Sequence, residues 1–176
     1  TPPRTEEPPQ AADPFVILGP EPSISTTSGP QDAPQTRSVN VPVSQGTKSV
    51  KLRYTTQTAE YPTYVLQQSV FNDRWSVILL GPSGQSLKNI TRNVNAQISQ
   101  EPVWVPGGLG GTTGMQEEQI DVTSLAAGGP VQLVLLVSAT NVGDSIFPTS
   151  VTASVAVSDF SISVTPDALA AATKND

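Results

Sequence analysis

The stretch Ser49-Val-Lys-Leu-Arg-Tyr-Thr55 alternates apolar and charged residues more cleanly than any other part of the chain. Side chains of a β-strand point in turn to the two faces of a sheet, so such alternation indicates a strand with one buried face. Val50, Leu52 and Tyr54 would face a core, and the two basic residues between them would face solvent. We therefore predict a half-buried strand here.

Similar patterns predict further strands after this one. Residues 75–80 run into a Gly-Pro-Ser-Gly sequence, in which proline and glycine favour a tight turn. Residues 119–125 and 149–164 alternate again. Residues 130–137 are almost continuously apolar, which is typical of a central strand whose neighbours cover both faces.

Three segments are less regular. Residues 38–43 alternate but contain Pro42, and because proline cannot donate to a strand ladder, we expect an edge strand. Residues 86–99 space their apolar side chains like a helix, but their poor helix formers favour an irregular strand, and both alternatives stay open. The glycine-rich residues 105–114 predict a flexible loop.

The sequence predicts a single domain with a flexible segment at each end. Residues 1–14 are rich in proline and acidic residues, which predicts a flexible linker. A β-sandwich domain is expected over residues 15–166, beginning with a short strand at 15–18 and a long surface connection at 19–34. Residues 167–176 are expected to be a flexible tail.

The composition agrees with a β-rich fold. The chain has 17 Pro, 13 Gly and no Cys, with 5% aromatic and 14% charged residues. Proline and glycine punctuate sheets, and about eight short strands separated by turns are typical of a sandwich. The sequence therefore predicts an all-β fold, an antiparallel two-sheet β-sandwich.

The charge excludes two classes of partner. The formal net charge is -6, and lysine and arginine do not cluster, so the counterion release that drives nucleic-acid binding is missing. The same acidity disfavours anionic membrane surfaces, and no apolar run approaches the roughly 18 residues of a spanning helix. We expect no nucleic-acid partner and no membrane insertion.

The residue types also restrict catalysis. The chain has no His and no Cys, which excludes Ser-His-Asp and Cys-His catalysis and disfavours zinc. A pair of carboxylates, as in glycosidases, remains an alternative. The acids available for it are Glu60, Asp73, Glu101, Glu117, Glu118, Asp121 and Asp144. Surface solvation accounts for most acids in such a protein, so we predict that it is not an enzyme.

Two parts of the chain carry a family-like pattern. The first is Val-Lys-Leu-Arg-Tyr-Thr-Thr-Gln-Thr-Ala-Glu-Tyr-Pro at residues 50–62, followed by Phe-Asn-Asp-Arg-Trp-Ser-Val-Ile-Leu at residues 71–79. The second runs from Glu-Gln-Ile-Asp-Val-Thr-Ser-Leu at residues 118–125 to Asn-Val-Gly-Asp-Ser-Ile at residues 141–146. The pattern resembles bacterial jelly-roll domains of large surface and secreted proteins, of the choice-of-anchor or adhesin type.

The resemblance implies a jelly-roll sandwich, an extracellular or cell-surface location and a calcium site on loops at one end. Its implied calcium ligands are Glu60, Asn72, Asp73 and Asp144. The alternative is that these are ordinary turn residues, because Asn, Asp and Gly dominate turns. The chain departs from the family pattern where residues 66–70 lack glycines and where Phe147-Pro148 stands in place of an acidic residue.

Two functions remain open at this point. The first is a non-enzymatic module for adhesion or recognition of a glycan or protein. A glycan site needs exposed aromatic rings, and the candidates are Trp104, Tyr61 and Tyr64, whereas Trp75 lies in a predicted strand and is expected in the core. The alternative is a structural component of a surface, secretion or phage-tail assembly with no small ligand.

Overall fold

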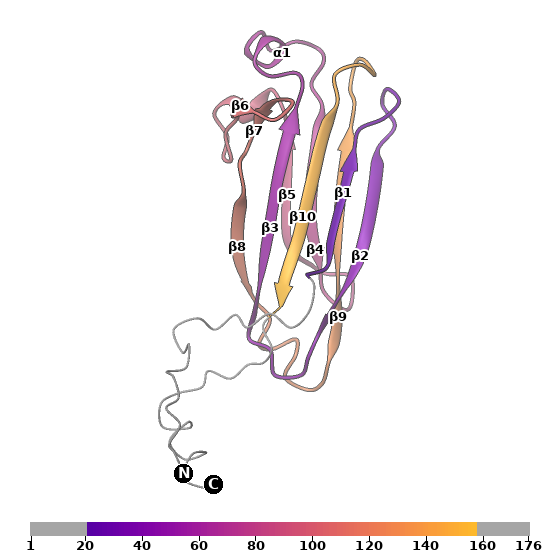
Figure 1. Ribbon diagram of the computed structural model, residues 1–176. Coiled ribbons are helices and arrows are strands. Elements are labelled where there is room, and N and C mark those ends of the chain that lie inside the picture. Colours follow the sequence, from indigo (N-terminus) through magenta and orange to yellow (C-terminus); the bar gives the residue numbers. More distant parts are fainter. Residues whose placement is uncertain (1–20, 158–176) are drawn as a thin grey trace, which may run out of the picture.

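The computed structural model describes residues 21–157, which form two packed antiparallel sheets (Figure 1). One sheet contains β1 (Ser23–Thr27), β10 (Thr149–Val157), β3 (Ser49–Thr58), β7 (Gly110–Thr112), β6 (Val105–Gly107) and β8 (Gln116–Asp121). The other contains β2 (Gln35–Val43), β9 (Val131–Thr140), β4 (Arg74–Leu80) and β5 (Ser86–Asn93). The predicted all-β two-sheet sandwich is confirmed.

The strand pairing is that of a jelly roll. With the short β6 and β7 set aside, the first strand pairs with the last, β1 with β10, and the second with the second-last, β2 with β9. The same nesting continues with β3 and β8, and with β4 and β5. The chain is thus one long folded-back hairpin wrapped into two sheets, the arrangement of a jelly roll.

The core follows the predicted alternation. Val50, Leu52 and Tyr54 of β3 are buried, and the residues between them are partly exposed, which confirms the half-buried strand. β9 lies between β2 and β4, so the predicted central strand is confirmed. One face of β9 is fully buried and the other only half-buried. β2, which contains Pro42, is an edge strand as predicted.

The structure corrects two local expectations and decides between the two alternatives left open for a third segment. Residues 19–34 are not only a surface connection, because they contain β1, whose Ile24 and Thr26 enter the core. Residues 105–114, predicted as a flexible loop, contain β6 and β7, which pair as a hairpin. The strand alternative holds for residues 86–93, and a short 3-10 helix, η2 (Ala96–Ile98), follows it.

Some expectations lie outside the described residues. These are the linker at 1–14, the strand at 15–18, the last part of the domain up to residue 166 and the tail at 167–176. Within residues 21–157, no helix has the length and apolar character needed to cross a membrane. The short helix α1 (Thr63–Leu66) has four residues.

The topology gathers two connections at one end of the sandwich. β3 ends and β4 begins there, joined by residues 59–73 with α1, and residues 141–148 join β9 to β10 at the same end (Figure 1). We call this the loop end. The described chain begins and finishes at the opposite end, where Val157 pairs with Val50 and β1 starts beside Ser154.

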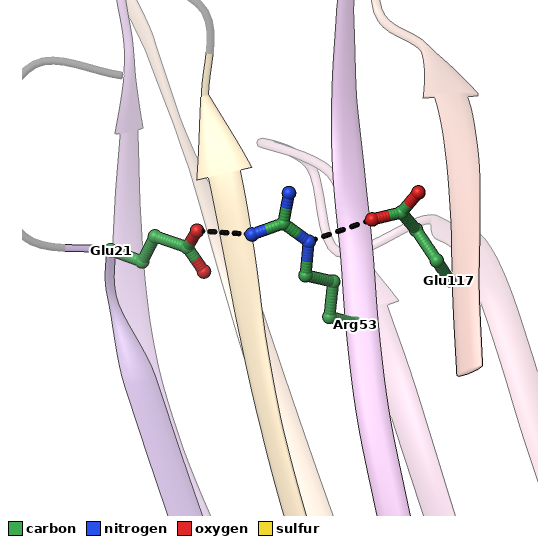
Figure 2. Close-up of polar contacts among 3 residues, drawn as sticks. All are labelled: Glu21, Arg53 and Glu117. Atoms are coloured by element: carbon green, nitrogen blue, oxygen red, sulfur yellow. Dashed lines mark hydrogen bonds and ion pairs between the residues drawn. The ribbon is translucent and has the colours of Figure 1, made fainter. Parts of the chain in front are cut away.

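An ionic network crosses the outer face of the first sheet. The Nε of Arg53 on β3 donates to Glu117 on β8 at 2.8 Å, and its terminal nitrogen donates to Glu21, which precedes β1 (Figure 2). Hydrogen bonding to Glu117 raises the pKa of Arg53, and the pKa of Glu117 is lowered in return. Arg53 therefore ties the start of β1 to the opposite edge of the sheet.

Arg53→Met is expected to lower the melting temperature by a few degrees at low salt, because exposed ion pairs contribute little each but more when networked. The difference from wild type should shrink at about 1 M NaCl, where salt screens the charges. Thermal unfolding at both salt concentrations checks this. Lys48→Met removes the same charge from a residue without an ion pair among residues 21–157. A decrease in melting temperature that is the same at both salt concentrations would mean that lost packing, and not lost ion pairing, causes it.

Candidate functional site

Two acids predicted as calcium ligands lie together beneath the loop end. Glu60 follows β3 and Asp73 directly precedes β4, and both side chains are fully buried. Asp73 accepts a hydrogen bond from the backbone N–H of Val142 at 2.9 Å and one from the hydroxyl of Thr149 at 2.7 Å. Asp73 thus fixes the 141–148 connection to the start of β4.

The carboxyl group of Glu60 lacks such partners. Neither of its oxygens meets a donor at regular hydrogen-bond geometry. Its polar neighbours are the carboxyl and backbone N–H of Asp73. Burial, and then the charge of Asp73, raise the pKa of Glu60 to about 9. The pKa of Asp73 is raised too, chiefly by burial. At neutral pH Glu60 therefore carries a proton.

The third predicted acid, Asp144, lies near this pair. Its Oδ1 accepts hydrogen bonds from the backbone N–H groups of Ile146 at 2.9 Å and Phe147 at 3.2 Å. Its Oδ2 is buried without a partner. The charge of Asp144 raises the pKa of both Glu60 and Asp73. Within residues 21–157, however, no three acidic side chains converge in the arrangement of a preformed metal site.

The fourth predicted ligand, Asn72, has a different role. Its side-chain oxygen accepts a hydrogen bond from the backbone N–H of Asn95 at 3.0 Å. Asn95 in turn donates from its side chain to the carbonyl of Ser69 at 2.7 Å. Asn72 therefore holds the segment after β5 against residues 59–73, and its oxygen is engaged there.

A buried polar layer supports the acids, and the sequence did not point to it. The Thr149 hydroxyl that donates to Asp73 lies 2.9 Å from the hydroxyl of Thr58. Ser28 accepts from the N–H of Thr149 and donates to the side chain of Asn141, both at 2.8 Å. These residues come from four strand ends far apart in the chain, and no local pattern in the sequence marks them.

Trp104 was predicted as an exposed glycan-binding residue, and this prediction is wrong. Its position between two prolines indicated an exposed loop, but its side chain is only 5% exposed. The indole N–H donates to the carbonyl of Val94 at 2.9 Å. The chain folds inward before β6, because the ring is large and apolar and its one polar group finds an acceptor there. Trp104 belongs to the core, together with the buried Trp75.

The two candidate tyrosines are half-buried. The side chain of Tyr61 packs against Gly111, where an added Cβ would lie 2.6 Å from the Cβ of Tyr61 and 2.7 and 2.8 Å from two of its ring atoms, so only glycine fits. Tyr64 packs edge-on against Phe71, with ring centroids 5.3 Å apart, and lies 4.9 Å from the ring of Phe147. Both tyrosines therefore pack against the loop end and are not fully exposed.

Exposed aliphatic side chains gather toward the loop end. Each large apolar side chain that is exposed among residues 21–157 lies on α1, on the connections beside it, on η2, on the β6–β7 hairpin or on the connection from β7 to β8. They are Leu66, Val70, Ile98, Val105, Leu109, Met115 and Ile146. Figure 1 places α1 and the hairpin beside the same end of β3. Among residues 21–157, the opposite end has no exposed large apolar side chain.

No protein-family model matches the chain, and no curated protein sequence is significantly similar to it. Among solved structures, a carbohydrate-binding module of Caldicellulosiruptor saccharolyticus, CBM27-1 in complex with mannohexaose, has a TM-score of 0.42 at 12% identity, over 76% of this chain and 72% of that one. The K3 adhesin domain of Lys-gingipain from Porphyromonas gingivalis has a TM-score of 0.35 at 11% identity, over 76% and 73%.

A virus structure has a similarly low TM-score. The infectious bursal disease virus structure has a TM-score of 0.35 at 16% identity, over 80% of this chain but only 29% of that chain. The chain is thus distantly similar to jelly-roll sandwich domains, including a carbohydrate-binding module and an adhesin domain. These values concern the shared architecture and carry no argument about a ligand.

Proposed function

We propose that this protein is a non-catalytic recognition module, located outside the cell or on its surface, which binds a glycan or protein at the loop end and uses calcium there. The observation that carries the proposal is the fully buried Glu60 carboxyl, whose polar neighbours both belong to Asp73, a second buried acid. This group lies directly beneath the connections that carry the exposed aliphatic side chains.

A buried pair of carboxyl groups is costly to maintain. Leaving a buried polar group unsatisfied costs about 1 to 3 kcal/mol, and more if the group is charged. Proteins retain such groups where they bind a proton or a cation. Calcium prefers oxygen ligands, and the residues that would hold it here are Glu60 and Asp73, joined by Asp144 only if the 141–148 connection moves, because the three side chains do not converge in this structure. Asn72 is left out, because its oxygen binds Asn95.

The absence of catalysis is supported by the same burial. Glycosidases place two carboxyl groups on either side of a bond in an accessible cleft. Glu60 and Asp73 are both fully buried, so a substrate does not reach them. The full chain also has no His or Cys to act as base or nucleophile. Recognition at the surface accounts for these features better than hydrolysis does.

Calcium at about 1 mM is expected to raise the melting temperature relative to EDTA at neutral pH. A ligand at about 100 times its Kd stabilises the native state by about 2.7 kcal/mol, or roughly 5 to 10 °C for a domain of this size. Glu60→Gln should abolish the rise, because the amide keeps the shape of the neutral acid and cannot offer a negative charge. Differential scanning calorimetry measures both.

Glu101→Gln is the matched control, because Glu101 is an exposed acid and should leave the calcium effect unchanged. Glu60 is a better test position than Asp73, whose two structural hydrogen bonds would be lost with it. If wild type shows no calcium-dependent rise, or if Glu60→Gln retains it, the calcium proposal is wrong. The structural-component alternative would then lead.

A further inference from the structure

We infer that an open hollow between the edges of the two sheets binds a neutral, hydroxyl-rich sugar unit of a glycan. The hollow lies on the side of the sandwich, between β5 and β8, and has a volume of about 310 Å³. Pockets for small ligands begin at about 300 Å³. This inference rests on the proposed recognition function, since it names a glycan as the ligand, but it adds a site other than the loop end that does not use calcium.

The edge strand β5 turns two basic side chains toward the inside of the sandwich. Residues directly opposite each other in a sheet point to the same face. Arg92 lies opposite Trp75 and Lys88 lies opposite Leu79, and both partners are buried in the core. Ile90, between the two basic residues, is buried as well. β5 therefore carries charges at two positions where its alternation would place apolar side chains.

The edge strand β8 turns polar side chains toward the same interior. Gln116 lies opposite Tyr54 and Glu118 lies opposite Leu52, and both partners are buried. Glu118 forms an ion pair with Lys88 of β5 at 3.0 Å, which joins the two sheets across the gap. Inward-pointing charges also protect edge strands from pairing with other chains, so this ion pair by itself does not indicate a ligand.

The hydroxyl of Tyr54 is the group that points to a ligand. Tyr54 is only 4% exposed and lines the hollow, and among residues 21–157 its hydroxyl has no hydrogen-bond partner. A buried tyrosine hydroxyl usually finds a partner. Burial raises the pKa of this hydroxyl, and the charges of Glu118 and Arg92 act on that pKa in opposite directions. The unpartnered hydroxyl thus lies between charged groups that line the same hollow.

The guanidinium of Arg92 is held in place and has donors left over. Its Nε donates to the carbonyl of Glu101 at 2.8 Å, and one terminal nitrogen donates to the carbonyl of Thr91 at 3.0 Å. Arg92 has no ion pair among residues 21–157. An arginine side chain has five N–H donors, so a preoriented cation and the Tyr54 hydroxyl both offer donors to a ligand.

The mixed lining selects a neutral ligand with many hydroxyl groups. Beside the donors of Arg92 and Tyr54 stand acceptors, among them Glu118 and the side-chain oxygen of Gln116, whose amide nitrogen already donates to the carbonyl of Thr113. The acids that line the hollow disfavour an anion, and the two basic residues disfavour a cation. An apolar ligand would leave buried polar groups without partners. A hydroxyl both donates and accepts, which suits this alternation.

The apolar part of the hollow is a buried floor and not an exposed ring. It consists of Tyr54, Ile90 and Pro102. The ring of Tyr54 packs on that of Trp75, with ring centroids 6.0 Å apart. The site therefore differs from the exposed aromatic platform expected from the sequence. Its residues come from β3, β5, β8 and the connection after η2, so no local pattern in the sequence marks it.

The test is an NMR titration of the full chain in EDTA. The probes are soluble oligosaccharides of mannose, glucose and xylose at millimolar concentration, with oligogalacturonate as the acidic comparison. We expect at least one neutral oligosaccharide to shift the backbone amide signals of residues 88–92 and 116–118. Tyr54→Phe should weaken this binding about two- to tenfold, the effect of one lost hydrogen bond. Arg92→Gln should weaken it at least as much.

The variants separate a binding role from a structural one. Tyr54→Phe keeps the ring in the core and removes a hydroxyl without a protein partner, so its melting temperature should equal that of wild type. Arg74→Gln is the matched control for Arg92→Gln, because Arg74 is exposed and does not line the hollow. Arg74→Gln should bind the neutral oligosaccharide like wild type.

Several outcomes would overturn the inference. If no neutral oligosaccharide shifts these amide signals, the inward charges serve only to protect the two edge strands. Equal binding by wild type and Tyr54→Phe would show that the hydroxyl is not used. Binding of oligogalacturonate alone would contradict a neutral ligand, and binding that requires calcium would assign the glycan to the loop end.

The calcium experiment stays separate from this one. A calcium-dependent rise in melting temperature without sugar binding in the hollow would leave the metal proposal standing and overturn this inference. Sugar binding in EDTA without a calcium effect would do the reverse.

Discussion

In EDTA, raising the pH from about 5 to about 9 is expected to lower the free energy of unfolding by several kcal/mol. Glu60 titrates near 4.5 in the unfolded chain, whereas burial and the neighbouring Asp73 raise its pKa to about 9 in the folded chain. Its stabilisation is therefore complete below the lower value and is lost as the pH rises through the upper one. The slope reaches about 1.4 kcal/mol per pH unit for one proton.

The raised pKa of Asp73 acts in the same direction. Urea unfolding at pH steps across this range, always in EDTA, measures the slope. Glu60→Gln should reduce the slope to the contribution of Asp73, because the amide stays neutral at every pH, and above pH about 8 this variant should be more stable than wild type. Glu101→Gln should keep the wild-type slope. A flat wild-type profile would mean that the Glu60 carboxyl is solvated or paired.

Trp104→Ala is expected to destabilise the protein by about 3 to 5 kcal/mol, the usual cost of removing a buried aromatic side chain. The ring is 5% exposed and its N–H is bonded to the carbonyl of Val94. The N–H of Val94 binds the carbonyl of Asp73 at 2.9 Å. The loss therefore extends to the candidate site, and the calcium response should weaken as well.

Chemical unfolding of two comparison variants shows whether the lost stability comes from the buried ring of Trp104. Trp104→Phe keeps most of the apolar ring and loses one hydrogen bond. This loss is expected to destabilise the protein by about 1 kcal/mol, in addition to the cost of any cavity that the smaller ring leaves. Leu109→Ala, on the neighbouring hairpin, should change stability very little, because its side chain is 48% exposed. A Trp104→Ala variant as stable as wild type would mean that the ring is exposed, as its position between two prolines had indicated.

The strands were predictable because their signal is local. The alternation at residues 49–55 and the apolar run at 130–137 reflect which face of each strand is buried. Proline at position 42 excluded a central place for its strand, and the structure has it at the edge. The strand β1 was missed because Ser23–Thr27 has a single large apolar side chain, Ile24, and the core on its inner face is completed by Thr26.

The candidate acids were found by their loop-like sequence context and the family resemblance. Their burial was not predicted. An Asn-Asp pair reads as an exposed turn, yet Asp73 is fully buried, because a hydroxyl and a backbone N–H from a distant connection satisfy it. In the same way, two neighbouring prolines suggested that Trp104 is exposed. The acceptor that allows its burial, the carbonyl of Val94, comes from another strand end.

By itself, the sequence determined the all-β class, the half-buried strand at residues 49–55 and the edge position of the strand with Pro42. These features depend on the alternation of side chains along one strand and on the missing N–H of proline. The family resemblance implied that Glu60, Asp73 and Asp144 lie at one end, and only the tertiary structure decided that the carboxyl groups of Glu60 and Asp73 are fully buried there. Strand order in a jelly roll arises from pairing between distant segments, and that pairing alone brings these connections together.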